Sequence, residues 1–137
     1  AMALGAEGVQ VGTRFALTQE SSAHPDFKAY GLTLEEGDTK LLLKKLSPTR
    51  LVKGAFCQAV EEAESRGASV EELRELLGRG RAKKGIFEGD LEDGELELGQ
   101  VASLFRQSQT VAEVMREMVE EYDAALAALK SSSLLDE

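Results

Sequence analysis

The sequence contains no tryptophan and only five phenylalanines, two tyrosines, two prolines, one histidine and one cysteine in 137 residues. Because Cys57 is alone, it cannot form a disulfide within the chain, which agrees with a reducing compartment. Long apolar runs are also missing. No stretch approaches the ~20 residues of a membrane helix, and no basic segment precedes a short apolar one as in a signal peptide. These absences predict a cytoplasmic protein with no membrane partner.

Basic side chains are scarce. Lysine and arginine total 16 against 25 aspartates and glutamates, so the formal net charge is −9. A nucleic-acid surface needs the opposite sign, and we therefore expect no nucleic-acid partner. The interval from Lys40 to Val60 contains no acidic residue. We interpret it as a solvated face that balances the acidic remainder, with a patch for a phosphate-bearing ligand as the alternative.

The segment from Gly8 to Phe15 has the pattern of a functional strand end. Val9 and Val11 alternate with polar or small residues, and the run ends in Gly12 followed by the hydroxyl of Thr13. This alternation predicts a β-strand from Gly8 to Arg14. Glycine at a strand end lets the backbone approach an anion, to which main-chain N–H groups and a hydroxyl can donate. A plain strand followed by a loop is the alternative, because turn chemistry alone accounts for such a glycine.

Four further segments accompany this one: Ala1 to Glu7, which has the pattern of a helix end closed by Gly5, then Glu20 to Pro25, Gly89-Asp90-Leu91 and Leu98-Gly99-Gln100-Val101-Ala102. In this order they closely resemble the carboxyl-terminal part of the nitronate monooxygenase family, also called 2-nitropropane dioxygenases. The FMN-dependent enoyl-acyl carrier protein reductases are near relatives of that family. The resemblance covers essentially the whole chain.

The resemblance implies an α/β fold, namely the last strand and last helix of a (β/α)8 TIM barrel with an inserted, mainly helical cap subdomain. It also implies FMN as the cofactor. Gln10, Val11, Gly12 and Thr13 would lie against the FMN phosphate and ribityl chain, and Gln100 would offer an amide near the flavin or substrate. For Gln100, an exposed position at a helix start is the alternative. The family's catalytic histidine belongs to an earlier part of the barrel, so His24 is expected to be a positioning residue.

The domain boundaries follow from the same resemblance. Residues 1–32 would be the end of the barrel, with the end of its seventh helix, its eighth strand and the following loop. Residues 33–97 would form the cap, residues 98–130 the return segment and final barrel helix, and residues 131–137 a polar tail. A complete barrel needs ~250 residues. We therefore expect a fragment whose partner is the missing amino-terminal part of the same barrel.

Local signals predict the helices and extended segments within these parts. Ser22 is expected to cap a helix beginning at Pro25, and extended structure is expected between Thr39 and Gly54. A helix after Gly54 would bury Phe56, Val60 and Ala63 and end at Gly67. Two capping boxes, each a hydroxyl residue three positions before a glutamate, are expected to start helices at Ser69 and Thr110.

Three other patterns suggest sites but have simpler explanations. The segment from Gly78 to Gly85 is not a dinucleotide-binding loop, because Lys83 stands where the third glycine should be. The acidic run from Glu88 to Glu95 lacks the spacing of a calcium loop, so we expect no metal. Cys57 lies in an apparent helix without a histidine nearby in sequence, and we interpret it as a small buried hydrophobe.

Two functional hypotheses remain. In the first, the chain is part of an FMN-dependent oxidoreductase that takes a small-molecule substrate. It would oxidise alkyl nitronates with O2 as co-substrate or, alternatively, reduce an enoyl thioester. In the second, it is an acidic helical interaction module without chemistry. A strand ending in Gly-Thr favours the first hypothesis, under which the fragment alone is expected to be inactive.

Overall fold

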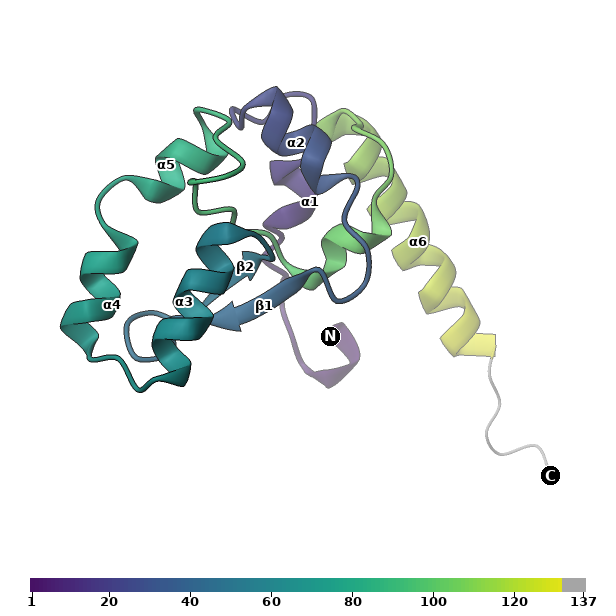
Figure 1. The fold of residues 1–137 in the computed structure, drawn as a ribbon. Coiled ribbons are helices and arrows are strands. Elements are labelled where there is room, and N and C mark those ends of the chain that lie inside the picture. The colour runs from purple at the N-terminus through teal and green to yellow at the C-terminus, as the bar shows by residue number, and fades with distance from the viewer. Residues whose placement is uncertain (132–137) are drawn as a thin grey trace.

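The fold was analysed in a computed structural model, which describes residues 1–131. Two short 3₁₀ helices, six α-helices and one β-hairpin are formed by those residues. In Figure 1, α6 extends along one side, the hairpin with α3, α4 and α5 lies on the other, and α1 and α2 lie between them. The elements are η1 Met2–Leu4, α1 Thr13–Ala16, α2 Pro25–Gly31, β1 Thr39–Leu42, β2 Thr49–Val52, α3 Ala55–Ser65, α4 Val70–Leu77, α5 Arg81–Ile86, η2 Gln100–Leu104 and α6 Val111–Ser131.

A hairpin and two helices build a core of their own. β1 pairs antiparallel with β2, with Thr39 opposite Val52, and Leu51 bridges onward to Glu97. The predicted stripe of α3 is confirmed, because Phe56, Val60 and Ala63 are all buried. Helix α3 packs under the hairpin, and Leu73 of α4 closes the far end of this core. Residues 42–77 thus supply most of their own apolar packing.

A second core joins segments that are far apart in the sequence. It is formed around Leu17, Phe27 and Leu98, with other apolar side chains from the same segments. Gly31 allows these segments to meet, since a Cβ atom there would lie 2.6 Å from the side chain of Leu17. The beginning of the chain is therefore packed against the segment that follows α5, and this core positions α1.

Both predicted capping boxes are present. The Ser69 N–H donates to the Glu72 carboxylate at 2.7 Å, and the Glu72 N–H donates to Ser69 Oγ at 3.2 Å. Thr110 and Glu113 make the same pair of bonds at 2.7 and 3.2 Å. These N–H bonds hold the pKa of both glutamates below its ordinary value. The local signals were sufficient because all the partners lie within one helical turn.

The predicted strand from Gly8 to Arg14 is wrong. Residues 8–12 have no regular secondary structure, and Thr13 already begins helix α1. A strand needs a neighbour that accepts and donates its backbone hydrogen bonds. Within residues 1–131, no segment pairs with residues 8–12. Apolar alternation alone therefore could not make a strand here.

Three smaller expectations have mixed outcomes. Gly5 does close the first helical turn in the left-handed conformation, at φ 93°. Ser22 does not cap α2, because His24 occupies the cap position and its Nδ1 accepts from the Asp26 N–H at 3.2 Å. Ser131 is the last residue of α6 rather than the first of a tail, and the remainder of the predicted tail, 132–137, lies outside the described residues.

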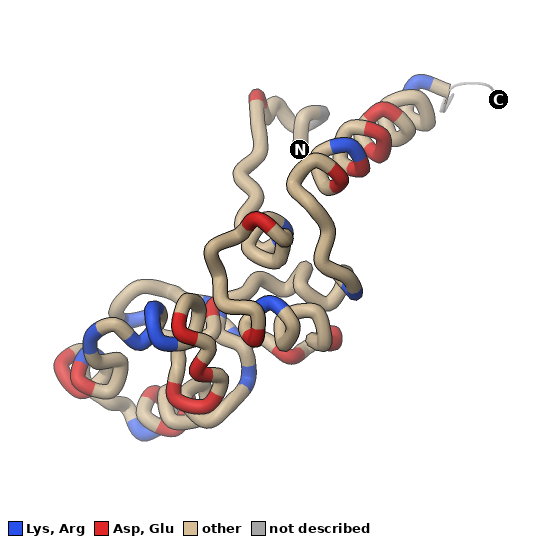
Figure 2. Tube along the Cα trace, turned by 90° about the horizontal axis from the view of Figure 1, so that it is seen from above, with Lys and Arg blue, Asp and Glu red and all other residues tan. Residues whose placement is uncertain are grey.

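Charged side chains of both signs are mixed along the chain. Figure 2 shows blue and red segments interspersed over the hairpin and its helices. Lys40 of the hairpin, for example, pairs with Glu61 of α3. The acid-free interval therefore has acidic neighbours in space, as expected of a solvated face. Among the described residues, no helix is long and apolar enough to cross a membrane.

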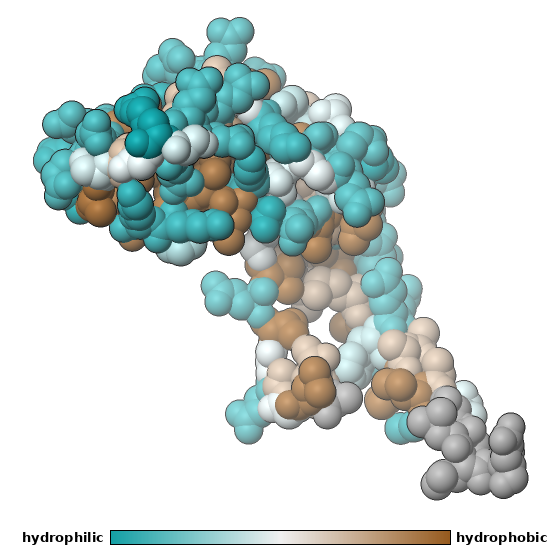
Figure 3. Space-filling view, turned by 60° about the horizontal axis from the view of Figure 1, so that its bottom comes forward, coloured by the Kyte–Doolittle hydropathy of each residue, from teal (hydrophilic) through white to brown (hydrophobic). Residues whose placement is uncertain are grey.

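Helix α6 carries an apolar face that no other described element covers. Val114 alone among the described residues of α6 is buried, and it lies in the first turn. We call the remaining stripe the open face of α6, and its exposed members are Val111, Met115, Val119, Tyr122 and Leu129. Figure 3 shows brown surface toward the end of the molecule that carries η1 and the second half of α6. An uncovered stripe of this length marks a packing surface.

Candidate functional site

The predicted site begins at the turn from Gly12 into α1. Gly12 is the N-cap residue, and a Cβ atom added there would meet nothing within 4 Å, so the space beside the turn is open. The first N–H groups of a helix have no partner within the helix. The turn that replaces the predicted strand therefore still presents main-chain donors at Thr13 and Arg14.

Thr13 connects this turn to the second predicted segment. The Gly99 N–H donates to Thr13 Oγ1 at 2.8 Å, across a separation of 86 residues. A Cβ atom on Gly99 would lie 3.0 Å from the same oxygen, so glycine permits the close approach. The structure thus brings Gly12 and Thr13 together with Gly99 and Gln100.

The other predicted site residues, Gln10, Gln100 and Val11, make fewer contacts with the rest of the described chain. Gln10 is exposed in the irregular segment, and Gln100 is exposed as the first residue of η2. Within the described part of the chain, neither of these two side chains forms a hydrogen bond. Val11 is half-buried and lines a cavity of about 610 Å³. Both glutamines are thus free to meet a ligand, and Val11 faces the interior.

That cavity lies between α1, η2 and α6. Arg14, Val101, Phe105 and Met118 are among its lining residues. It is mainly apolar, with charged groups from Arg14 and Glu117 at its wall. The cavity extends from Glu117, Met118 and Glu121 of α6 to the segment that contains Val11.

The local sequence pattern did not reveal Arg14 as part of the site. Its guanidinium pairs with Glu117 at 2.9 Å, donates to the side chain of Gln109 and lies 4.4 Å from the ring centre of Phe105. The side chain is only 14% exposed. Its partners lie some ninety to a hundred positions further on in the sequence, with separations of 95 for Gln109 and 103 for Glu117. No periodicity or spacing rule would have found these contacts.

The loop after α1 is held by hydrogen bonds between side chains and main-chain groups. Lys28 Nζ donates to three of its carbonyl oxygens, those of Thr18, Gln19 and Ser21, at 3.1 to 3.2 Å. The carboxylate of Glu20 accepts from the Val111 N–H at 3.0 Å, where α6 begins. The loop therefore fixes α1 relative to α2 and α6.

The remaining sequence patterns have structural roles. Arg81 donates to carbonyl oxygens of Leu77 and Leu76 and lies 4.6 Å from the ring centre of Phe56, so the basic segment caps α4. Asp90 accepts from two backbone N–H groups and pairs with Lys84 at 3.0 Å. No group of three or more potential metal ligands occurs in residues 1–131.

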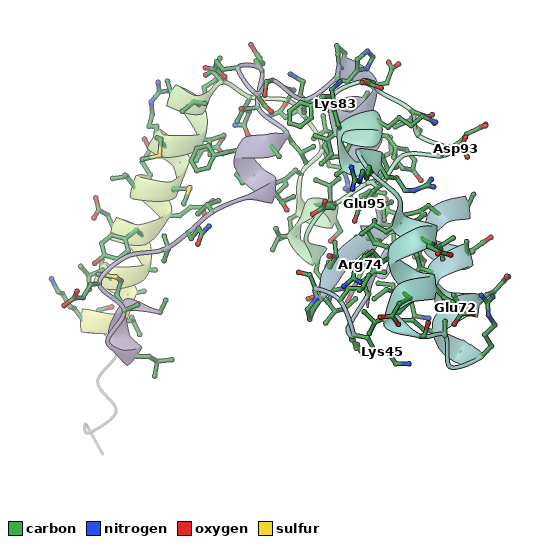
Figure 4. All side chains as sticks on the ribbon, turned by 90° about the vertical axis from the view of Figure 1, so that its left-hand side faces the viewer. Lys45, Glu72, Arg74, Lys83, Asp93 and Glu95 are labelled. Carbon is green, nitrogen blue, oxygen red and sulfur yellow. The ribbon has the colours of Figure 1, made fainter. Side chains whose placement is uncertain are left out.

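Two ionisable groups are buried away from the turn of α1. Burial raises the pKa of the Cys57 thiol, and the nearby Glu61 adds to this effect. Burial also raises the pKa of Glu95, with a further contribution from Glu97 and an opposing one from Arg81. Figure 4 shows Glu95 in the interior and Asp93 toward the surface. A neutral thiol is a weak nucleophile, so Cys57 behaves as a core residue.

The fold and the site together define an α/β domain with open space beside the turn into α1. The model of the nitronate monooxygenase family matches residues 1–121. The chain belongs to the nitronate monooxygenase family.

Two known proteins, one of them with a point mutant, show the extent of the similarity. A probable nitronate monooxygenase from Bacillus subtilis (strain 168) is 51% identical over 41 residues, which are 30% of this chain and 12% of that protein. FabK from Thermotoga maritima is 32% identical with a TM-score of 0.83, and a point mutant of it is 29% identical with a TM-score of 0.78. Each structure matches 94% of this chain, which spans only 38–41% of FabK.

Proposed function

We propose that this chain is the carboxyl-terminal part of an FMN-dependent oxidoreductase and that it holds the phosphate end of the cofactor. Gly12 and Thr13 would bind the phosphate, Gln10 and Val11 would lie along the ribityl chain, and Gln100 would face the flavin or the substrate. The hydrogen bond between Thr13 and Gly99 carries this proposal. It joins the two segments that the family resemblance assigns to the cofactor.

The groups at the turn fit a phosphate. The main-chain N–H groups at the start of α1 are free of intrahelical partners. The oxygen of Thr13 accepts from Gly99, so its hydroxyl proton remains available for a ligand. Gly12 leaves the adjacent space open. A phosphate needs such a set of donors, and a bound FMN would supply the redox chemistry.

The chain's own residues would bind and orient the cofactor. Charge-assisted hydrogen bonds from Thr13 and the turn would fix the phosphate. The apolar side chains around Val11 and Val101 would exclude water from the neighbouring cavity. Catalytic groups would come from the part of the protein that this chain does not contain.

We also propose that the chain forms the last part of a (β/α)8 barrel and its cap. α6 would be the final barrel helix, and residues 8–12 would lie beside the barrel strands that this chain does not contain. Two features support this assignment. The open face of α6 is available for packing, and 94% of this chain matches 41% of the FabK chain. The separate core of residues 42–77 supports a cap at residues 33–97.

The test uses the full-length protein that contains this chain. Flavin absorbance bands in the purified protein are expected, together with turnover of propionate 3-nitronate in the presence of O2. NAD(P)H-dependent reduction of an enoyl thioester, without nitronate oxidation, would assign the protein to the alternative activity. A well-folded protein without bound flavin would refute the proposal and favour the non-catalytic interaction module.

A further inference from the structure

We propose that Arg14 is a positioning residue, whose side chain fixes the first turn of α1 and thereby the phosphate contacts of Gly12 and Thr13. This inference rests on the proposed function, because it concerns the same site. It adds a residue that acts on the site without touching the cofactor.

Helix α1 is too short to hold its own orientation. It has four residues, and isolated helices of that length are not stable. Its N-cap residue, Gly12, provides no side-chain hydrogen bond. The loop after α1 and the core around Leu17 hold the carboxyl end of the helix, so the direction of the N–H groups at its first turn also depends on contacts made by the side chains of α1.

Arg14 supplies contacts to three separate parts of the chain. Its guanidinium stacks on Phe105, directly after η2, and bonds to Gln109, just before α6. It also pairs with Glu117, in the second turn of α6, at 2.9 Å. Gln109 in turn donates to Glu117, so the three polar side chains form one closed network. This network ties the first turn of α1 to the start of α6.

The guanidinium is engaged by other groups of the chain. The Arg14 side chain is 14% exposed, and its guanidinium lies over the ring of Phe105 and pairs with Glu117. Thr13, the preceding residue, accepts a hydrogen bond from the Gly99 N–H at its Oγ1. Arg14 therefore acts on the phosphate contacts through the backbone of the turn rather than through its own charge.

Arginine suits this role better than lysine. Its planar fork can bond two acceptors while its face stacks on a ring, whereas an ammonium group offers no planar face. A lysine at position 14 would keep the charge and the pairing with Glu117 but lose the stacking on Phe105. A methionine would keep the length and apolar contact but lose every hydrogen bond.

The test compares Arg14→Met and Arg14→Lys in the full-length protein, with Arg74→Met as the control. Arg74 is an exposed residue of α4 and is not among the residues that line the cavity. Two measurements are made. Hydrogen exchange of the Gly99 amide in the flavin-free protein reports the Thr13 contact, and the ³¹P resonance of FMN at saturation reports the phosphate contacts.

For Arg14→Met we expect Gly99 exchange to become about tenfold faster or more, the ³¹P resonance to shift, and the FMN dissociation constant to rise about tenfold. Arg14→Lys should show smaller changes in the same directions, and Arg74→Met should change neither signal. If Arg14→Met does not fold, Glu117→Gln replaces it, and a shifted ³¹P resonance is again expected.

Two negative results are distinguishable. An unchanged ³¹P resonance in a folded Arg14→Met or Glu117→Gln protein that still binds FMN would overturn this inference and leave the proposed function intact. This holds even if the variant is less stable, because a purely structural role would lower stability without moving the phosphate signal. Absence of FMN from the unchanged protein would overturn the proposed function and this inference with it.

Discussion

Thr13 is expected to serve both the cofactor and the fold. Replacing its hydroxyl by a methyl group in Thr13→Val removes a phosphate donor and the acceptor of the Gly99 N–H. A hydrogen bond to a charged group contributes about 1.5–3 kcal/mol, so the FMN dissociation constant should rise about tenfold to a hundredfold. Thr13→Ser keeps the hydroxyl and should bind nearly normally. Fluorescence titration of the full-length protein measures both, and equal affinity in Thr13→Val would remove Thr13 from the site.

Gln100 is expected to affect turnover more than cofactor retention. It is exposed at the start of η2, next to the glycine that bonds Thr13, and its side chain is free for a substrate. In Gln100→Ala we expect kcat to fall while the flavin content stays normal. Gln58→Ala, an exposed residue of α3, is the control. Normal kcat and normal flavin content in Gln100→Ala would make Gln100 a surface residue.

Glu95 should make stability depend on pH. Burial raises its folded-state pKa above the unfolded value, so the folded state holds its proton more tightly and stability falls as pH rises between the two values. Glu95→Gln should therefore increase the free energy of unfolding at about pH 7 and leave it unchanged at about pH 4. Urea unfolding at both pH values tests this, with Glu92→Gln, an exposed position, as control. A less stable Glu95→Gln protein at neutral pH would mean that attraction to Arg81 exceeds the cost of burial.

At the residue scale, the sequence was informative where partners are close in the chain. The glutamates of both capping boxes lie three positions from their hydroxyl partners, and the structure contains both boxes. Arg14 could not be identified in the same way, since its partners are brought to it only by the packing of α6. The family resemblance pointed to the segments that contain Thr13 and Gly99, but it did not predict the hydrogen bond between them.

At the scale of elements, intrinsic signals predicted the helices better than the strand. Helices α3, α4 and α6 satisfy their own backbone, so periodicity and caps were enough to place them. The segment at residues 8–12 depends on a neighbour for its hydrogen bonds and remains irregular without one. The bonding of a strand is a property of two segments, which one segment's pattern cannot predict.

The packing of α5 should be sensitive to a single methyl group. A Cβ atom on Gly85 would lie 2.6 Å from the Glu95 carbonyl oxygen, which belongs to the backbone and cannot easily move. Alanine gains up to about 1 kcal/mol in helix propensity, but such overpacking costs about 1–3 kcal/mol. We expect a net loss of stability in Gly85→Ala, measured by urea unfolding. Gly54→Ala, where an added Cβ meets nothing within 4 Å, should change stability less, and equal effects would contradict this account.

At the scale of the whole molecule, these 137 residues alone should neither bind FMN tightly nor catalyse a reaction. Among residues 1–131, no strand pairs with residues 8–12 and no element covers the open face of α6. An exposed apolar surface of this kind also favours self-association. Titration of FMN into the isolated chain, followed by fluorescence quenching, should show no binding at micromolar concentrations. Tight binding with turnover would overturn the assignment to part of a barrel.

The hydrogen bond between Arg106 and the Leu34 carbonyl bears on how the chain accommodates insertions. It joins two points 72 positions apart, and the Thr13–Gly99 bond joins two others 86 positions apart. The segment between Leu34 and Gly99 is therefore held at both of its ends by hydrogen bonds to other parts of the chain. Doubling the length of a flexible loop whose ends are held together costs only about 0.6 kcal/mol of loop-closure entropy. Insertions between Leu34 and Gly99 should therefore cost little stability.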